Sequence, residues 1–426
     1  MRQCRPLLDR VQVVLDAPDI SSDGGLLLLR KTDRRWDLTR RFARCLGDSR
    51  RQASVRHSAW KMLAQRVMGV CLGWEDCNDF DALKSDPLYT VCLNAEPAPQ
   101  PTLSRFENAV SHRDLYRMSE ELAAFFVDRH RGKAPRRIVL DLDATDDPAH
   151  GQQEFEFYHG YYQTHCFLPL LVFAQVDGAP MELLAAVLRP GNSHAGKRSA
   201  ALLRRLVRIL KEAFPVTEIL VRADGGFALP EMYAQCESLG LTYLISLPKN
   251  SRLQELSKDL MLESREIAHE TQATSRLFGE LTYAAATWPG ERRVIVKAEV
   301  MAKGDNPRYV VTNLQGDPET LYTLYVQRGD SENRIKELKL DLFSGRTSCH
   351  RFAANCFRLL LHGLAFVLLS LVRELLAGTE LARSTMGQIR LKLLKVAAIV
   401  EPSTRRILVR LPRGHPHGGL LLSLLG

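Results

Sequence analysis

The sequence contains no two cysteines at the C-x2-C spacing and no apolar run long enough to cross a bilayer. Its nine cysteines are scattered, and an odd number without paired spacing indicates free thiols in a reducing compartment and argues against a zinc site. Cys349 and His350 are adjacent, which is not a ligand spacing, and both are interpreted as structural. The most apolar stretch, residues 359–372, is too short to span a membrane and carries His362, so we expect a buried helix. No signal peptide is evident, and together these absences favour a cytoplasmic protein without a membrane partner.

What the sequence does contain is an excess of positive charge. Its 58 Lys and Arg outnumber 49 Asp and Glu, which gives a net charge of +9, while 45% hydrophobic and 25% charged residues are ordinary for a globular chain. Residues 30–66 hold twelve Lys or Arg against three Asp, and residues 383–413 hold eight against Glu401 alone. Clustered positive charge of this kind indicates nucleic acid as the partner.

The pattern of apolar residues changes near residue 137. Residues 1–134 show helical spacing. Within them a proline-broken linker precedes the helix start TLSRFENAV, and the region ends in a turn-rich stretch. Beyond them we expect five strands, at RIVLDLD, CFLPLLVFAQ, MELLAAVL, EILVRADGGF and LTYLISLP, and two helices, at GKRSAALLRRLVRILKEAF and LPEMYAQCESLG. After Lys249 a charged helical piece leads into three β-rich runs, FGELTYAAATW, RRVIVKAEVMA and PRYVVTNL.

Two of the expected strands end in acidic residues. Asp143 lies two residues after Asp141, and the period-two alternation of a strand places both on the same face. Asp224 follows the apolar run of the fourth strand and precedes two glycines, which permit a close backbone approach. Neighbouring carboxylates raise one another's pKa unless a divalent cation lies between them. Asp146 and Asp147, by contrast, fit a solvated turn at a strand end.

A third acid lies in the segment YVQRGDSENRIKELK. On a continuous helix, with about 100° per residue, four of its side chains fall within about 60° of one another: Tyr325, Arg328, Glu332 and Lys339. Asp330 and Glu337 would point away from this stripe. A carboxylate flanked by cations suits a metal ligand beside a phosphate backbone, whereas a solvated helix with i,i+4 ion pairs is the plainer interpretation.

The spacing Y-x2-R-x3-E-x6-K resembles the Tyr-Arg-Glu-Lys motif of a large group of DDE-type insertion-sequence transposases. Asp143-Ala144-Thr145 matches the Asp-x-Thr form of the first motif of these enzymes, which favours Asp143 over Asp141. The resemblance covers residues 137–345 and implies an α/β fold: an RNase-H-like catalytic core with an inserted all-β subdomain, flanked by mainly helical N- and C-terminal regions. In that core the first and fourth strands are neighbours.

The resemblance also implies an organisation of the whole chain. The expected parts are a helical, basic DNA-binding region at 1–134, the first part of the core at 135–248, a β-rich insertion at 249–318, a catalytic helix at 319–345 and a basic, helical C-terminal region at 346–426. The C-terminal segment NCFRLLLHGLAFVLLSLVREL is apolar enough to be either core or interface. On charge alone, the helix TLSRFENAV and the basic run before it are candidates for contacts to DNA ends.

The implied function is that of a transposase, an endonuclease that binds the ends of a mobile element, cleaves them and transfers the strands during DNA recombination. The catalytic acids and metal ligands would be Asp143, Asp224 and Glu332, with Asp141 as a further candidate metal ligand. Three such carboxylates suggest two-metal phosphoryl chemistry with two Mg2+ ions, for which Mn2+ could substitute. The resemblance implies that Tyr325, Arg328 and Lys339 hold phosphates or a distorted terminal base, and Lys336 lies near the same stripe.

The expected partners are double-stranded DNA, both the inverted-repeat ends and the target, and a second copy of the chain, since two ends must be brought together. This places the protein at the nucleoid. The aromatic loop HGQQEFEFYHGYYQTHCF could stack on an unpaired base, although such residues more often pack a loop onto its own sheet. Two alternatives stay open: a nuclease of the same fold, and a non-catalytic DNA-binding regulator, which would be expected to have lost one of the three acids.

Overall fold

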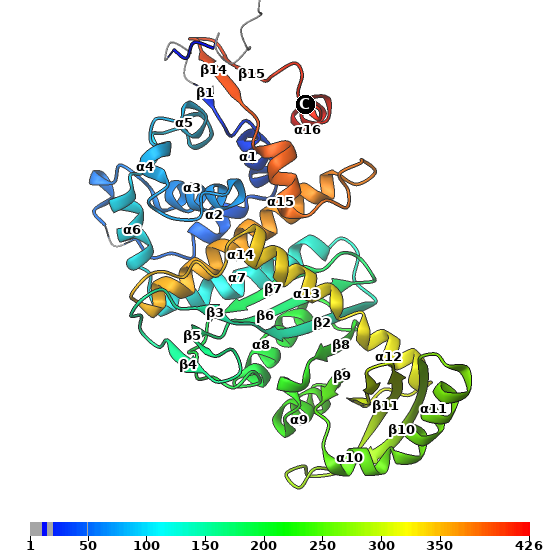
Figure 1. Cartoon of the computed structure of the whole chain (residues 1–426). Coiled ribbons are helices and arrows are strands. Elements are labelled where there is room, and N and C mark those ends of the chain that lie inside the picture. Colours follow the sequence, from blue (N-terminus) through cyan, green and yellow to red (C-terminus); the bar gives the residue numbers. More distant parts are fainter. Residues whose placement is uncertain (1–10, 15–19, 49) are drawn as a thin grey trace, which may run out of the picture.

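The computed structural model describes residues 11–14, 20–48 and 50–426. Its centre is a nine-stranded mixed sheet of order β10-β11-β13-β9-β8-β2-β6-β7, with β12 paired to β11 (Figure 1). The bounds are β2 Arg137–Ala144, β6 Leu170–Val176, β7 Glu182–Val187, β8 Glu218–Ala223, β9 Thr242–Leu247, β10 Ser275–Tyr283, β11 Arg292–Met301, β12 Gly304–Asp305 and β13 Arg308–Thr312.

The strands β7, β6, β2, β8 and β9 correspond to the five expected from the sequence. β2 pairs with β8 in parallel and with β6 antiparallel, which confirms that the first and fourth strands are neighbours. Leu142 lies opposite Ala223 in this pairing. Asp143 directly follows Leu142, and Asp224 directly follows Ala223, the last residue of β8. The parallel register therefore brings both acids to the same edge of the sheet.

The run CFLPLLVFAQ forms two strands instead of the single expected one. Pro169 separates β5 (Thr164–Phe167) from β6, because proline has no N–H to donate to a strand ladder. β5 belongs to a small sheet in which it lies between β3 (Asp147–Pro148) and β4 (Phe157–His159). The aromatic loop of the sequence is therefore an ordered hairpin.

The segment after β9 contains both helices and strands. α10 (Ser251–Leu256) and α11 (Lys258–Thr271) precede β10, and together with the following strands they form the lobe at the lower right of Figure 1. β13 pairs antiparallel with β9, with Tyr309 opposite Leu247. The insertion thus extends the central sheet, and a separate all-β subdomain is not confirmed.

The expected catalytic helix is broken into three pieces. α12 (Pro318–Val326) is capped by Asp317, α13 (Gly329–Lys336) begins after a turn at Gln327 and Arg328, and a π-helical turn, η4, spans Glu337–Asp341. A hydrogen bond of 3.0 Å from Leu342 N–H to the Glu337 carbonyl closes the π turn. Gly329 favours the break because glycine lowers helix stability.

Helices cover both faces of the central sheet. On one face α8 (Ser199–Ala213) and α9 (Pro230–Ser238) pack with α7 (His112–His130) against Val172 and Val221. On the other face α14 (Phe352–Leu375) packs against β6 and β7, where the Phe173 and Phe366 rings lie 5.7 Å apart. The insertion end of that second face is covered by α12 through Leu321.

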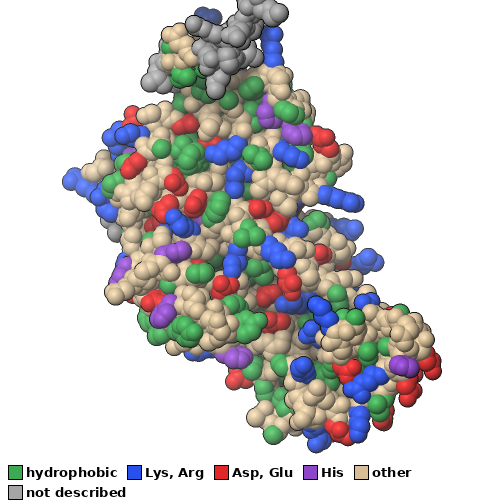
Figure 2. All heavy atoms as spheres, viewed as in Figure 1, with side chains coloured by type: hydrophobic (Ala, Val, Ile, Leu, Met, Phe, Trp, Pro, Cys, Tyr) green, Lys and Arg blue, Asp and Glu red, His purple; other side chains and the backbone are tan. Residues whose placement is uncertain are grey.

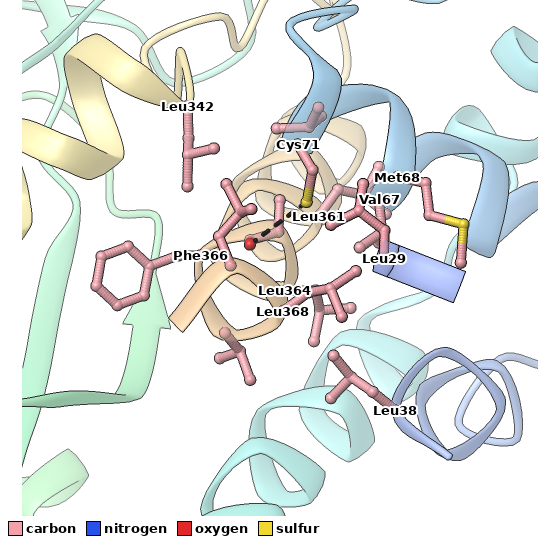
Figure 3. Close-up of a cluster of buried hydrophobic side chains, with 14 of the residues drawn as sticks. Leu29, Leu38, Val67, Met68, Cys71, Leu342, Leu361, Leu364, Phe366 and Leu368 are labelled. Carbon is pink, nitrogen blue, oxygen red and sulfur yellow. Dashed lines mark hydrogen bonds between the residues drawn. The ribbon is translucent and has the colours of Figure 1, made fainter. Parts of the chain in front are cut away.

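The N-terminal helices form one core with α14. Their bounds are α1 Leu26–Trp36, α2 Leu38–Ala43, α3 Ala59–Leu72, α4 Phe80–Leu83, α5 Pro87–Leu93 and α6 Gln100–Asn108, with the short turn η2 at Gln52–Ser54. Figure 3 shows Val67 and Cys71 of α3 facing Leu361 and Leu364 of α14, and the Cys71 thiol donates to the Ala365 carbonyl at 3.5 Å. α14 is long and apolar enough to cross a membrane, but 94% of its apolar window is buried inside the protein. The expected buried helix is confirmed, whereas the expectation that the apolar stretch is too short to span a membrane is wrong, because the helix continues on both sides of residues 359–372.

The C-terminal region is less helical than expected. After α15 (Met386–Ile389) and the π turn η5 (Arg390–Leu394) come β14 (Ala398–Pro402), β15 (Ile407–Arg410) and the last helix, α16 (Gly418–Leu425). β14 pairs with both β15 and β1 (Ile20–Ser21), so the two ends of the described chain share a three-stranded sheet. The eight cysteines in the described part of the chain are all free thiols.

Candidate active site

An open pocket of about 460 Å³ lies where the carboxyl ends of β2 and β8 meet α13. It brings together acidic and basic side chains from segments far apart in the sequence. Its charged lining consists of Asp143, Asp224, Glu332, Arg328, Lys336 and Lys339. Every expected catalytic acid is therefore in one pocket, beside three of the four expected DNA-contacting residues.

Asp224 is held at the pocket by the loop that follows β8. It caps the short helical turn η3 (Gly225–Phe227) by accepting a hydrogen bond of 2.9 Å from the Gly226 N–H. A Cβ at position 226 would lie 2.7 Å from the Ala195 Cβ, so the loop can pack this closely only with glycine at 226. The two glycines after Asp224 thus let the acid sit at a tightly packed strand end.

Asp143 is the most buried acid of the pocket, with 7% of its surface exposed. Burial raises its pKa to about 7, and the charges of Asp224, Glu332 and Asp141 act in the same direction, whereas Arg328 opposes them. The pocket therefore concentrates negative charge around a carboxyl that ionises with difficulty. Such a site favours the entry of an additional cation.

The Arg328 guanidinium lies between two of the acids. Its Nη2 donates to Asp143 Oδ2 at 2.9 Å, and its Nη1 donates to Glu332 Oε1 at 2.7 Å. The Arg328 side chain is 11% exposed, whereas that of Glu332 is 52% exposed. Arg328 therefore supplies the positive charge that keeps this pair of carboxylates together.

The donor chemistry of the pocket fits a hard divalent cation, because its acids offer carboxylate oxygens. Among the described residues, however, no three or more His, Cys, Asp or Glu are gathered closely enough to hold a metal ion. Arg328 occupies the space between Asp143 and Glu332. A metal ion held by both acids would require Arg328 to release them.

Asp141 does not line the pocket. It is fully buried and forms a bidentate ion pair with Arg222, with both nitrogen–oxygen distances at 2.7 Å. Arg222 Nη1 also donates to the Leu324 carbonyl at 2.8 Å, which ties β8 to α12. The expectation that Asp141 is a metal ligand conflicts with this ion pair, since both of its oxygens are already engaged by a buried cation.

The remaining residues of the stripe lie in different surroundings. Lys339 Nζ donates to Asp146 Oδ1 at 2.7 Å and to Thr145 Oγ1 at 3.2 Å, so it fastens η4 to the end of β2. Lys336 is exposed at the pocket rim. Tyr325 is beside the pocket and not in its lining, and burial raises its pKa, as do Asp224 and Glu332.

The acids after Asp143 were expected in a solvated turn, and for Asp147 this is wrong. Asp147 is 2% exposed in β3 and accepts a hydrogen bond of 2.7 Å from the Thr347 hydroxyl. Burial raises its pKa to about 7. Its burial results from pairing with β5 and contact with a segment 200 residues away, which no local sequence signal reveals.

Most basic residues of the two clusters, residues 30–66 and 383–413, lie at the surface, and a few are engaged inside the protein. Arg66 is fully buried and pairs with Glu107 at 2.6 Å. Arg390 donates to the Cys71 carbonyl at 2.8 Å and thereby closes the end of α3. The surface therefore presents most of the positive charge counted in the two clusters, and Arg66 is the buried exception among their described residues.

A basic concavity of about 620 Å³ lies beside α6. Its lining includes Arg51, Arg56 and Lys84 together with Thr102 of α6, so the structure brings the helix TLSRFENAV and the basic run together. Burial and the nearby cations lower the pKa of His57 in the same concavity. Figure 2 shows Lys and Arg projecting from the edge of the N-terminal region, whereas Asp and Glu gather at the lower right over α11.

Comparison with known proteins gives one extensive match. A family model described as "Transposase DDE domain group 1" matches residues 7–426. A search of curated proteins returned no match. Among solved structures, "Mos1 transposase paired-end complex with left transposon end" is 14% identical, with a TM-score of 0.17, over 46% of this chain and 65% of that chain. "Crystal structure of the Mos1 mariner paired end complex with Mn" is 12% identical, with a TM-score of 0.18 and the same coverage.

Proposed function

This chain belongs to the group 1 family of transposase DDE domains, and on that premise we propose that it binds the ends of an insertion sequence and catalyses metal-dependent DNA cleavage and strand transfer. The observation that carries this proposal is the meeting of Asp143, Asp224 and Glu332 in one open pocket. Strand β2, the loop that follows β8 and helix α13 contribute one acid each. In an α/β sheet the carboxyl ends of the strands are where ligands bind.

In the proposed mechanism the three acids would hold two Mg2+ ions, or Mn2+ in their place. When bound, such ions activate the attacking oxygen and stabilise the leaving oxygen during phosphodiester cleavage. Asp143, the most buried of the three acids, provides a fixed anchor at the end of β2, whereas the half-exposed Glu332 can adjust from α13. Asp141 is left out of this set because it belongs to the ion pair with Arg222.

The cations of the pocket are proposed to position the DNA backbone. Lys336 and Lys339 line the same wall as Glu332. Lys336 is exposed and can donate to phosphate oxygens, and Lys339 would do so after it releases Asp146. Arg328 would exchange its two carboxylate partners for a phosphate once the acids are occupied by metal. Tyr325, beside the pocket on α12, would support the terminal nucleotide of the DNA end.

Other parts of the chain contribute to the same proposal. The N-terminal region, through α6 and the basic concavity beside it, would contact the transposon end outside the cleavage site. The C-terminal region packs with the N-terminal helices and would strengthen this arm. We further propose that the protein works as a homodimer on two DNA ends and acts at the nucleoid in the cytoplasm.

The test is DNA cleavage by the purified full-length protein. The substrate is a fragment that carries the gene's own flanks, incubated with Mg2+ or with EDTA. Glu332→Gln removes one acid from the pocket, and Glu319→Gln, an exposed residue at the start of α12, is the matched control. Glu332 is half exposed, so its neutral replacement should leave the fold intact.

The proposal expects cleavage at the flank boundaries that needs Mg2+, persists in Glu319→Gln and falls at least a hundredfold in Glu332→Gln. Binding of the flanks without cleavage under any divalent metal would instead support a regulator. Cleavage without preference for the flanks would support a nuclease.

A further inference from the structure

The hairpin of β4 and β5 extends from the same strand end that carries Asp143. β2 runs into β3, and β3 pairs with β5, with Asp147 opposite Phe167. β4 pairs with β5 from Phe157 to His159, which leaves a tip at residues 160–163 (Figure 1). The hairpin is thus fastened to the end of the catalytic strand.

The hairpin rests on the loop that joins β7 to α8, residues 188–198. A Cβ at Gly191 would lie 1.9 Å from the Cys166 carbonyl oxygen and 2.7 Å from that of Phe157, so the two backbones touch directly. The same loop then packs against the Asp224 loop, because a Cβ at Gly196 would lie 2.9 Å from the Gly226 carbonyl oxygen. Hairpin and loop therefore form a continuous wall between the ends of β2 and β8.

A buried arginine holds the loop of this wall in place. Arg189 is 5% exposed, and its Nη1 donates to the carbonyls of Ala195 at 2.6 Å and Lys197 at 3.1 Å. Lys197 and Arg198 are exposed, and they follow directly after this pinned backbone. The loop thus presents two cations from a fixed support.

The hairpin tip presents aromatic rings. The Tyr161 side chain is 84% exposed and Tyr158 is 57% exposed. The ring of Tyr161 lies edge-on to that of Tyr162, with centroids 5.0 Å apart, and Tyr162 in turn lies 5.0 Å from His159. Burial raises the pKa of Tyr162 to about 12, and the charges of Asp146, Asp143 and Asp224 act in the same direction.

We propose that residues 158–162 of the hairpin and residues 194–198 of the loop bind an unpaired DNA strand next to the carboxylate pocket. Tyr161 stacks on a base, Tyr162 supports the Tyr161 ring, and Lys197 and Arg198 bind the phosphates of that strand. Exposed aromatics combined with cations are the chemistry that holds single strands, because every base has a face for stacking. This inference rests on the proposed function and names the form of DNA that its pocket receives.

The test compares binding of two DNA ends by the full-length protein in EDTA, measured by fluorescence anisotropy. One end is a blunt duplex of the gene's flank, and the other carries four unpaired nucleotides. The wild type should bind the unpaired end about tenfold more tightly, since a stacked base is worth a factor of this order. Tyr161→Ala should abolish the preference and Tyr161→Phe should keep it, while Tyr116→Ala, which removes an exposed tyrosine on α7, should change nothing.

The phosphate contacts have a separate readout. The double variant Lys197→Gln, Arg198→Gln should make the dependence of affinity on salt shallower for the unpaired end. The magnitude of the slope of log affinity against log salt should fall by about 1.4, which is about 0.7 for each lost phosphate contact. An unchanged preference in Tyr161→Ala would overturn the inference. A sedimentation coefficient of DNA-free Tyr161→Ala that differs from the wild-type value would also overturn it, because Tyr161 would then support the fold and not a bound base. A wild type that cleaves its flanks yet shows no preference overturns this inference alone. A wild type that neither binds nor cleaves them overturns the proposed function as well.

Discussion

Replacing Arg328 with methionine should tighten metal binding while it slows cleavage. The guanidinium bridges Asp143 at 2.9 Å and Glu332 at 2.7 Å, and it has to leave both acids before a metal ion can use them. Hydrogen bonds between charged groups contribute about 1.5–3 kcal/mol each. Because the Glu332 side chain is 52% exposed, water screens its ion pair with Arg328, and that hydrogen bond contributes less free energy.

We therefore expect a net cost of about 1.4–2.8 kcal/mol for displacing Arg328, which corresponds to about 10- to 100-fold in metal affinity. Methionine is similar in length and carries no charge, so the Arg328→Met variant should avoid this cost. Arg308→Met, an exposed position on β13, is the matched control. Cleavage by Arg328→Met should fall at least about tenfold, because a charge-assisted contact to phosphate is lost.

The assay is Mn2+ binding without DNA, followed by electron paramagnetic resonance at pH 8, where Asp143 of the wild type is mostly ionised because its pKa is about 7. Arg328→Met raises that pKa further, because the Arg328 charge opposes the shift, so the gain in Mn2+ affinity should grow as the pH rises. Circular dichroism checks that the variant is folded. Mn2+ affinity that is equal to or weaker than that of the wild type would refute the reasoning, because Arg328 would then not compete with the metal.

Three further predictions concern the surroundings of the pocket. Asp141→Asn should lower the free energy of unfolding in urea by about 3–5 kcal/mol, because it leaves the buried Arg222 cation without its partner, and a loss below 1 kcal/mol would contradict this. Asp147 has a folded pKa of about 7, above its unfolded value, so it favours folding at low pH. Metal-free protein should lose stability from about pH 4 to pH 7, by at most about 4 kcal/mol from this group. Asp147→Asn should flatten this dependence of stability on pH, and an unchanged dependence would count against the role given to Asp147. Gly191→Ala should destabilise the protein by about 1–3 kcal/mol, because its Cβ collides with the hairpin backbone, and an unchanged melting temperature would speak against the tight contact.

The three acids could be found from the sequence because each lies at a position with a local signal. Asp143 and Asp224 follow apolar runs, and strand ends are readable from such runs. Glu332 was found through its spacing from Tyr325 and Lys339, although the helix is in fact broken at Arg328 and again at η4. Arg328, Glu332 and Lys339 nevertheless line the same pocket, whereas Tyr325 lies beside it.

What the sequence did not reveal depends on contacts between distant segments. The difference between Asp141 and Asp143 lies in Arg222, which comes from the neighbouring strand. The insertion strands join the central sheet through the pairing of β13 with β9, and edge pairing of this kind leaves no local pattern. The basic regions lie mostly at the surface, as their sequence predicts, but no local pattern shows that the fold buries Arg66 against Glu107.

The most direct test of the central claim is whether the three acids act as one unit. Single variants Asp143→Asn, Asp224→Asn and Glu332→Gln, and their double combinations, would be compared in Mg2+-dependent cleavage of the flanking DNA. Residues that work together give grossly non-additive effects. The account predicts that each single variant loses nearly all cleavage and that no double variant is slower than the singles. Substantial cleavage by any single variant, or losses that multiply in the doubles, would contradict it.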